Sequence, residues 1–152
     1  MASSIGEICS HEVVFATRET TVAAAAKLMR HHHVGSIVVV EQMNGGRRMP
    51  VGIVTDRDVL VEVTAMDLDP AVITVGDIMV HQLVTARESE GVLETMEIMR
   101  YKGVRRLPIV GADGQLVGIV TIDDLLEVLA EELSELAKIV VRERSREAST
   151  RK

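Results

Sequence analysis

The sequence predicts a mixed α/β (α+β) fold in which two β-α-β-β-α repeats pack sheet to sheet with pseudo-two-fold symmetry. Two observations lead to this prediction. The chain repeats itself at a nearly constant offset, and each copy contains two runs of β-branched residues separated by a Gly-containing turn. The chain has 152 residues, of which 47% are hydrophobic, so it can supply a substantial core. One repeat alone is small for a stable domain, and the two are therefore expected to share that core.

The repeat becomes visible when the sequence is displaced by 70 residues. SIGEICSHEVVFA (residues 4–16) then aligns with TVGDIMVHQLVTA (residues 74–86). Farther along the offset falls to 66, where residues 51–60 align with residues 117–126 and seven of ten positions are identical. The four-residue difference lies between the two β-branched runs, in stretches that contain Gly beside polar residues. Turns tolerate such insertions, so the register of the repeat survives.

Each repeat is expected to contain the same elements in the same order. A short strand (13–15; 83–85) leads into a helix, for which Thr20 or Thr21 is the candidate N-cap of the first copy. The β-branched runs (37–40 and 51–54; 107–110 and 117–120) form a hairpin, and a second helix follows. The predicted division is residues 5–66 for repeat 1, 67–74 for the linker, 75–130 for repeat 2, and 131–152 for a C-terminal helix and a frayed tail.

Composition excludes several classes of protein. The net charge of −6 argues against nonspecific nucleic-acid binding, which needs a basic surface. Cys9 is the only cysteine, so no internal disulfide forms. No secretory signal and no apolar run of about 18 residues is present, so no membrane partner and a cytoplasmic location are expected. No nucleophile–base–acid set appears, and no enzymatic activity is expected.

The repeated strings resemble the cystathionine-β-synthase (CBS) domain. They are VGDIM at 75–79, GVRRLPIV at 103–110, and GIVTxxD at 52–58 and 118–124. The resemblance covers about residues 5–130, twice over, and it implies a regulatory module that acts without a required cofactor. Members bind adenosine-containing ligands (AMP, ADP, ATP, S-adenosylmethionine or NAD), commonly associate as homodimers through their helices, and regulate an effector protein.

The Thr-x-x-Asp strings allow two interpretations. In the CBS motif, the positions of Thr55 and Thr121 contact ribose or phosphate, and those of Asp58 and Asp124 contact ribose hydroxyls. A carboxylate suits a cis-diol because it accepts two hydrogen bonds. Thr-x-x-Asp is also a helix-start pattern in which the threonine is the N-cap and the acid occupies the third helical position. The two roles are compatible at threonine.

By the family rule, each cleft joins the Asp-bearing motif of one repeat to the first strand of the other. The expected lining of cleft one is Thr55, Asp58, Arg57, Ser36, Ile37, Val38, Val84, Thr85 and Ala86. The expected lining of cleft two is Thr121, Asp124, Arg105, Arg106, Leu107, Pro108, Val14, Phe15, Ala16 and Thr17. Aromatic residues make up only 1% of the chain, so aliphatic side chains are expected to hold the adenine.

The two clefts are expected to differ in charge. Arg105 and Arg106 occupy family positions that often contact phosphate, whereas repeat 1 has Gly35 and Ser36 there. Arg suits phosphate because its guanidinium donates several hydrogen bonds at once. Cleft two is therefore the better candidate for a phosphorylated ligand.

Two further features bear on function. Residues 31–33 are three consecutive histidines, and consecutive side chains on a helix point about 100° apart. We therefore interpret them as the C-terminal turn of a helix rather than as a metal site. A phosphate contact by one of the three remains an alternative. An apolar repeat with three- and four-residue spacing predicts a coiled-coil seam, formed by Leu126, Leu129, Leu133, Leu136 and Val140. This seam supports the alternative function, a ligand-free dimerisation scaffold acting through its helices.

Overall fold

Two three-stranded sheets form the centre of the structure, a computed structural model that describes residues 4–151. The first sheet contains β1 (Phe15–Ala16), β2 (Ser36–Gln42) and β3 (Arg48–Thr55), and the second contains β4 (Ala86–Arg87), β5 (Arg106–Val110) and β6 (Leu116–Thr121). In each sheet the short first strand pairs in parallel with the second, which pairs antiparallel with the third. The predicted fold class is therefore confirmed, although β1 and β4 begin two or more residues later than expected.

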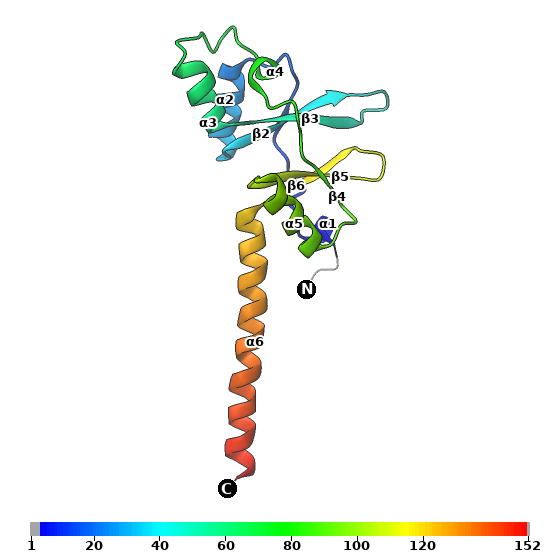
Figure 1. Ribbon diagram of the computed structural model, residues 1–152, viewed down its shortest axis with the longest axis vertical. Coiled ribbons are helices and arrows are strands. Elements are labelled where there is room, and N and C mark those ends of the chain that lie inside the picture. Colours follow the sequence, from blue (N-terminus) through cyan, green and yellow to red (C-terminus); the bar gives the residue numbers. More distant parts are fainter. Residues whose placement is uncertain (1–3, 152) are drawn as a thin grey trace.

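Helices flank both sheets (Figure 1). They are α1 (Ile5–Ile8), α2 (Val22–His32), α3 (Asp56–Val59), the π-helical turn η1 (Leu60–Thr64), α4 (Val75–Ile78), α5 (Val92–Lys102) and α6 (Ile122–Thr150). Helix α2 begins where the Thr21 hydroxyl accepts the Ala24 N–H at 3.2 Å. It ends at His33, whose φ of 54° is left-handed, and α5 ends in the same way at the equivalent Gly103. The histidine run thus forms the C-terminal turn of α2.

The two repeats exchange their N-terminal helices. Ile5 of α1 and the following Cys9 are buried against Leu107 and Val120 of the second sheet. Conversely, Val75 of α4 and the residue after the helix, Met79, are buried in the core of the first sheet. Neither repeat therefore completes its own core, which is the physical reason that the repeats fold as one body.

Backbone bridges fix this exchange at equivalent places. Ser10 bridges Ile119 of β6, with N–H···O distances of 2.9 Å in both directions, and Val80 bridges Ile53 of β3. The crossing requires glycine in the strand. A Cβ on Gly118 would lie 2.6 Å from Cys9 Sγ and 2.7 Å from the Ser10 carbonyl oxygen.

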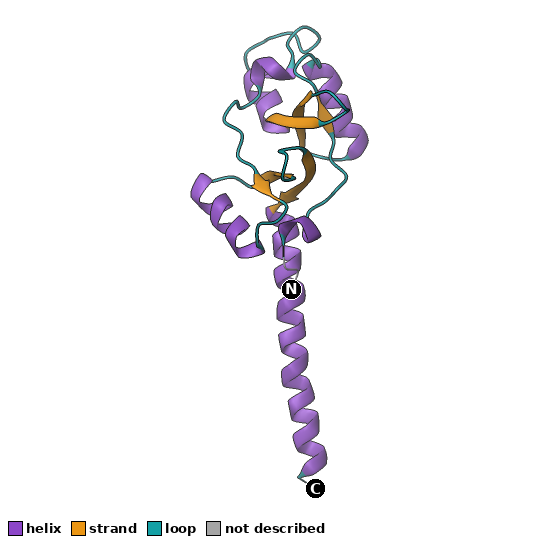
Figure 2. Cartoon of the chain, turned by 90° about the vertical axis from the view of Figure 1, so that its right-hand side faces the viewer, coloured by secondary structure: helices purple, strands orange, loops and turns teal. Residues whose placement is uncertain are grey.

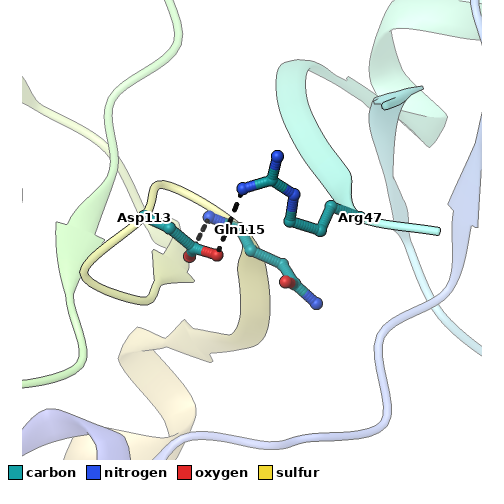
Figure 3. Close-up of polar contacts among 3 residues, drawn as sticks. All are labelled: Arg47, Asp113 and Gln115. Atoms are coloured by element: carbon teal, nitrogen blue, oxygen red, sulfur yellow. Dashed lines mark hydrogen bonds and ion pairs between the residues drawn. The ribbon is translucent and has the colours of Figure 1, made fainter. Parts of the chain in front are cut away.

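A third apolar cluster joins the two sheets. Val38 and Val40 of β2 contact Leu116 of β6, together with the half-buried Phe15 and Ile119. The tips of the two hairpins also meet: Arg47 Nη1 lies 3.9 Å from Asp113 Oδ2, and the second oxygen of Asp113 accepts the Gln115 N–H at 3.0 Å (Figure 3). Because Arg47 and Asp113 are both about half exposed, this ion pair adds little to stability.

The C-terminal helix α6 projects away from the sheets as a single rod (Figures 1 and 2). Leu125 is buried in the second core, whereas every residue from Leu133 to Arg151 is exposed. The expected frayed tail is instead helical to Thr150. Within residues 4–151, no helix combines the length and apolar character needed to cross a bilayer.

Candidate functional site

A cavity of about 310 Å³ opens where the two repeats meet. Its volume lies at the lower end of the range typical of small-molecule sites. Both repeats supply its walls, and its lining residues are Glu12, Val13, Val14, His33, Val34, Gly35, Ser36, Arg106, Ile119, Thr121 and Asp123. The structure therefore brings Val14, which precedes β1, into one cavity with Thr121, which ends β6.

A second, wider groove of about 470 Å³ continues from this cavity. The two share Glu12, Val13, Val14 and Val34. Phe15, Leu28 and His32 complete the wall of the groove. The cavity and the groove adjoin at these shared residues, and we call the two together the central cleft.

Arg106 is the arginine that lines the cavity of the central cleft. Its Nη1 donates to the Gly35 carbonyl oxygen at 3.4 Å, across the boundary between the repeats. Arg105, one residue earlier, is exposed, and its carbonyl oxygen accepts the Ile122 N–H at the start of α6. Only Arg106 of this pair lines the cavity.

Both Thr-x-x-Asp strings form complete capping boxes. Thr121 Oγ1 accepts the Asp124 N–H at 3.3 Å, and Asp124 Oδ2 accepts the Thr121 N–H at 2.9 Å. Thr55 and Asp58 make the same two bonds, at 3.1 and 2.9 Å. The capping interpretation is thus realised at both copies, while the second oxygen of each carboxylate remains outside the capping box.

Other predicted site residues lie away from the cavity lining. Ile37, Val38, Leu107 and Pro108 are buried in the sheets, as are Ala16 and Ala86 of the first strands. Phe15 is half-buried, and the Arg48 guanidinium lies 4.3 Å from its ring centre. Val84, Thr85 and Thr17 are partly exposed near the first strands, and Arg57 is exposed on α3. Ser36, predicted for cleft one, instead lines the cavity that contains Thr121.

Several lining residues were not predicted from the sequence. Glu12, Val13, Val34, Ile119 and Asp123 line the cavity because of the exchange between the repeats, which no local pattern reveals. His33 also lines it, and His32 lines the groove, so two of the three histidines face the central cleft. Their position follows from the left-handed turn at the end of α2. Two acidic residues, Glu12 and Asp123, therefore line the same cavity as Arg106.

This arrangement of exchanged repeats around a central cleft matches a known family. The family model described as "CBS domain" matches residues 5–65 and 75–131, so the chain belongs to the CBS domain family. It is a CBS domain pair, a regulatory module.

Relatives of known sequence cover part of the chain. An uncharacterized protein of Methanopyrus kandleri is 42% identical over 79 residues, which are 52% of this chain and 40% of that protein. Hypoxic response protein 1 of Mycobacterium tuberculosis is 32% identical over 80 residues, which are 53% of this chain and 55% of that protein. The chain thus matches about half the length of these relatives.

Solved structures cover more of it. An uncharacterized conserved protein from Pyrococcus horikoshii superimposes with a TM-score of 0.71 at 30% identity, over 84% of this chain and 92% of that chain. A CBS domain pair in complex with 5′-methylthioadenosine and S-adenosyl-L-methionine superimposes with a TM-score of 0.70 at 25% identity, over 84% and 99%. Hypoxic Response Protein I, solved with two coordinated zinc ions, has a TM-score of 0.70 at 28% identity, over 82% and 98%. In the described part of this chain, no group of three or more His, Cys, Asp or Glu residues is arranged to hold a metal ion.

Proposed function

We propose that the chain is a non-enzymatic sensor that binds an adenosine-containing ligand in the central cleft. The main support for this proposal is the cavity itself, which is lined by Val14 of repeat 1 and by Arg106 and Thr121 of repeat 2. Apolar walls with a few convergent polar groups are the usual composition of a small-molecule site. A structural relative that binds 5′-methylthioadenosine and S-adenosyl-L-methionine supports the ligand class.

In this proposal the adenine lies between the valines of the cleft, and the ribose lies against Thr121 and Asp124. Asp124 Oδ2 is held by the Thr121 N–H, so Oδ1 is the oxygen that accepts from a ribose hydroxyl. Arg106 contacts a phosphate or carboxylate of the ligand. The capping and binding roles then coexist, because each uses a different oxygen of the same carboxylate.

The charges of the lining favour some adenosine ligands over others. The residues that line the cavity include one arginine, Arg106, and two acidic residues, Glu12 and Asp123. Carboxylates repel a triphosphate and attract a cation. We therefore expect AMP or the cationic S-adenosylmethionine to bind more tightly than ADP, ATP or NAD.

Binding is tested by titrating AMP, ADP, ATP, S-adenosylmethionine and NAD into the full chain. A ligand at one hundred times its dissociation constant should stabilise the fold by about 2.7 kcal/mol in thermal melts. If none of the five changes the melting temperature, the sensor proposal fails. The alternative, a ligand-free scaffold, then gains support from the capping boxes, which are complete without a ligand.

The ribose contact is tested with two neighbouring carboxylates. Asp124→Asn keeps an oxygen that can accept the Thr121 N–H but weakens acceptance from the ribose, so affinity should fall about tenfold with little loss of stability. With AMP as the ligand, Asp123→Asn is the comparison variant: Asp123 lines the cavity but makes no bond in the capping box, and removing its negative charge should leave the affinity for AMP unchanged or raise it. Loss of affinity in Asp123→Asn alone would reassign the ribose contact while leaving ligand binding intact.

Signalling follows from a ligand that binds one arrangement of the module better than another. We propose that the receiver is a separate effector protein in the cytoplasm and that no nucleic acid or membrane takes part. The module is further proposed to act as a homodimer.

A further inference from the structure

The exposed part of α6 is an apolar stripe without a partner in one chain. From Leu133 to Val141 five large apolar side chains are between 48% and 66% exposed: Leu133, Leu136, Ile139, Val140 and Val141. Leu133, Leu136 and Val140 continue the seam that begins at Leu126 and Leu129, at the three- and four-residue spacing of a coiled coil, and Ile139 and Val141 flank it. Such a contiguous apolar stripe on a helix that projects from its domain marks an interaction surface.

The charges of α6 are separated along its length. Residues 122–137 contain six carboxylates and no basic residue, whereas residues 138–151 contain five basic residues and two carboxylates. The helix dipole favours acids near the N-terminus and bases near the C-terminus, but only within the first and last turns. Here the acidic half extends to Glu135, almost four turns into the helix.

We propose that α6 pairs antiparallel with the α6 of a second copy of this chain. In an antiparallel pair, the acidic half of each helix lies beside the basic half of the other. A parallel pair would instead place the two acidic halves together and the two basic halves together. The charge pattern therefore selects both the partner and its direction.

The pattern also sets a register. Centring the pair between Leu133 and Leu136 brings Leu133 of each copy against the partner helix's equivalent of Leu136. At this register Glu127 lies at the axial level of Arg142 in the other copy and Glu131 at that of Lys138, on the outer faces of the pair, so the acidic and basic halves attract as halves rather than through ion pairs at the seam. Leu126 and Glu143 then occupy one layer of the contact.

The same charges disfavour a membrane surface as the occupant. A helix that lies on an anionic bilayer carries Lys and Arg along its whole polar face and bulky aromatic or aliphatic residues on the other. The acidic first half of α6 would be repelled by such a surface. This proposal does not depend on ligand binding in the central cleft.

The partner is tested by analytical ultracentrifugation of the full chain. We expect a dimer that weakens as salt is raised, because salt screens the attraction between the acidic half of one helix and the basic half of the other. Leu133→Lys should weaken the dimer tenfold or more, whereas Ser134→Lys, its neighbour outside the seam, should have little effect. A monomeric wild type, or a dimer that Leu133→Lys leaves intact, would overturn the proposal.

The direction is tested by disulfide formation in a Cys9→Ala background. In the antiparallel register, Leu126→Cys mixed with Glu143→Cys should form a cross-linked heterodimer. Glu143→Cys alone should not cross-link, because its two copies lie about 26 Å apart along the helices, far beyond the reach of a disulfide. A disulfide in Glu143→Cys alone, with none in the mixture, would establish the parallel arrangement and refute ours.

Discussion

The crossing of Cys9 and Ser10 over Gly118 gives the most direct test of the exchanged repeats. In Gly118→Ala the new methyl carbon would lie 2.6 Å from Cys9 Sγ and 2.7 Å from the Ser10 carbonyl oxygen. Relieving the second contact moves backbone, and it strains the two 2.9 Å hydrogen bonds between Ser10 and Ile119. Overpacking costs about 1–3 kcal/mol and each weakened hydrogen bond about 1 kcal/mol, so we expect a loss of about 3 kcal/mol.

Gly52 is the matched control, because it occupies the equivalent position in repeat 1. The three atoms nearest to a Cβ there all belong to Met79: Sδ at 2.5 Å, Cγ at 3.1 Å and Cβ at 3.2 Å. The thioether is flexible and can turn aside, so Gly52→Ala should cost about 1 kcal/mol. Urea unfolding followed by circular dichroism, at one fixed protein concentration, measures both values. Equal losses in the two variants would refute the account, since it rests on backbone being harder to displace than a methionine side chain.

Three further predictions concern single side chains. Burial raises the pKa of the Cys9 thiol above its usual value of 9.0. The stability that the neutral thiol provides is therefore complete below that pH and is lost as the pH rises through the folded-state pKa. Between about pH 8 and pH 10 wild type should lose more urea resistance than Cys9→Ala, and equal losses would contradict this. Thr95 is fully buried and donates to the Gly91 carbonyl oxygen at 2.8 Å, so Thr95→Val should lower the free energy of unfolding by about 1 kcal/mol, measured by thermal melts against wild type. Arg106→Gln should weaken AMP binding in calorimetric titrations, while Arg105→Gln, which alters an exposed side chain, should not; equal effects would remove Arg106 from the binding site.

The sequence predicted the elements of the fold better than their assembly. The β-branched runs became β2, β3, β5 and β6 because alternation and turn residues act locally. The exchange of α1 and α4 was not predicted, since these four-residue helices carry no periodic signal and are held by tertiary contacts. The cavity lining was missed in part for the same reason: Glu12 and Asp123 meet only after the repeats cross.

The local Thr-x-x-Asp motif predicted two alternative roles for the same residues, helix capping and ligand binding. Thr121 and Asp124 suggested both a cap and a ribose site, and the structure forms both hydrogen bonds of the cap. Ser36 was predicted for cleft one by a rule that treats the two clefts as separate. The structure instead places it in one cavity with Arg106, whose guanidinium reaches the neighbouring Gly35 carbonyl.

The base of α6 offers a physical route from the central cleft to the proposed dimer. Ile119, Thr121 and Asp123 line the cavity, and Thr121 is also the N-cap from which α6 begins. A ligand held by these residues therefore acts on the first turn of a helix that is a single rod to Thr150. Because a continuous helix transmits a small change of angle along its length, we expect the bound ligand to alter how two copies of α6 meet.

This coupling is measurable with the cysteine pair of Leu126→Cys and Glu143→Cys. Ligand at saturation should change the rate of heterodimer disulfide formation, whereas in an Asp124→Asn background the same concentration should change it less. The ligand shifts the equilibrium between the two dimer arrangements by at most its difference in binding free energy for them, so a tenfold preference in affinity shifts it by about 1.4 kcal/mol. If calorimetry shows that the protein is saturated and the cross-linking rate is still unchanged, the two functions are independent. The cleft would then bind ligand and α6 would dimerise without coupling between them.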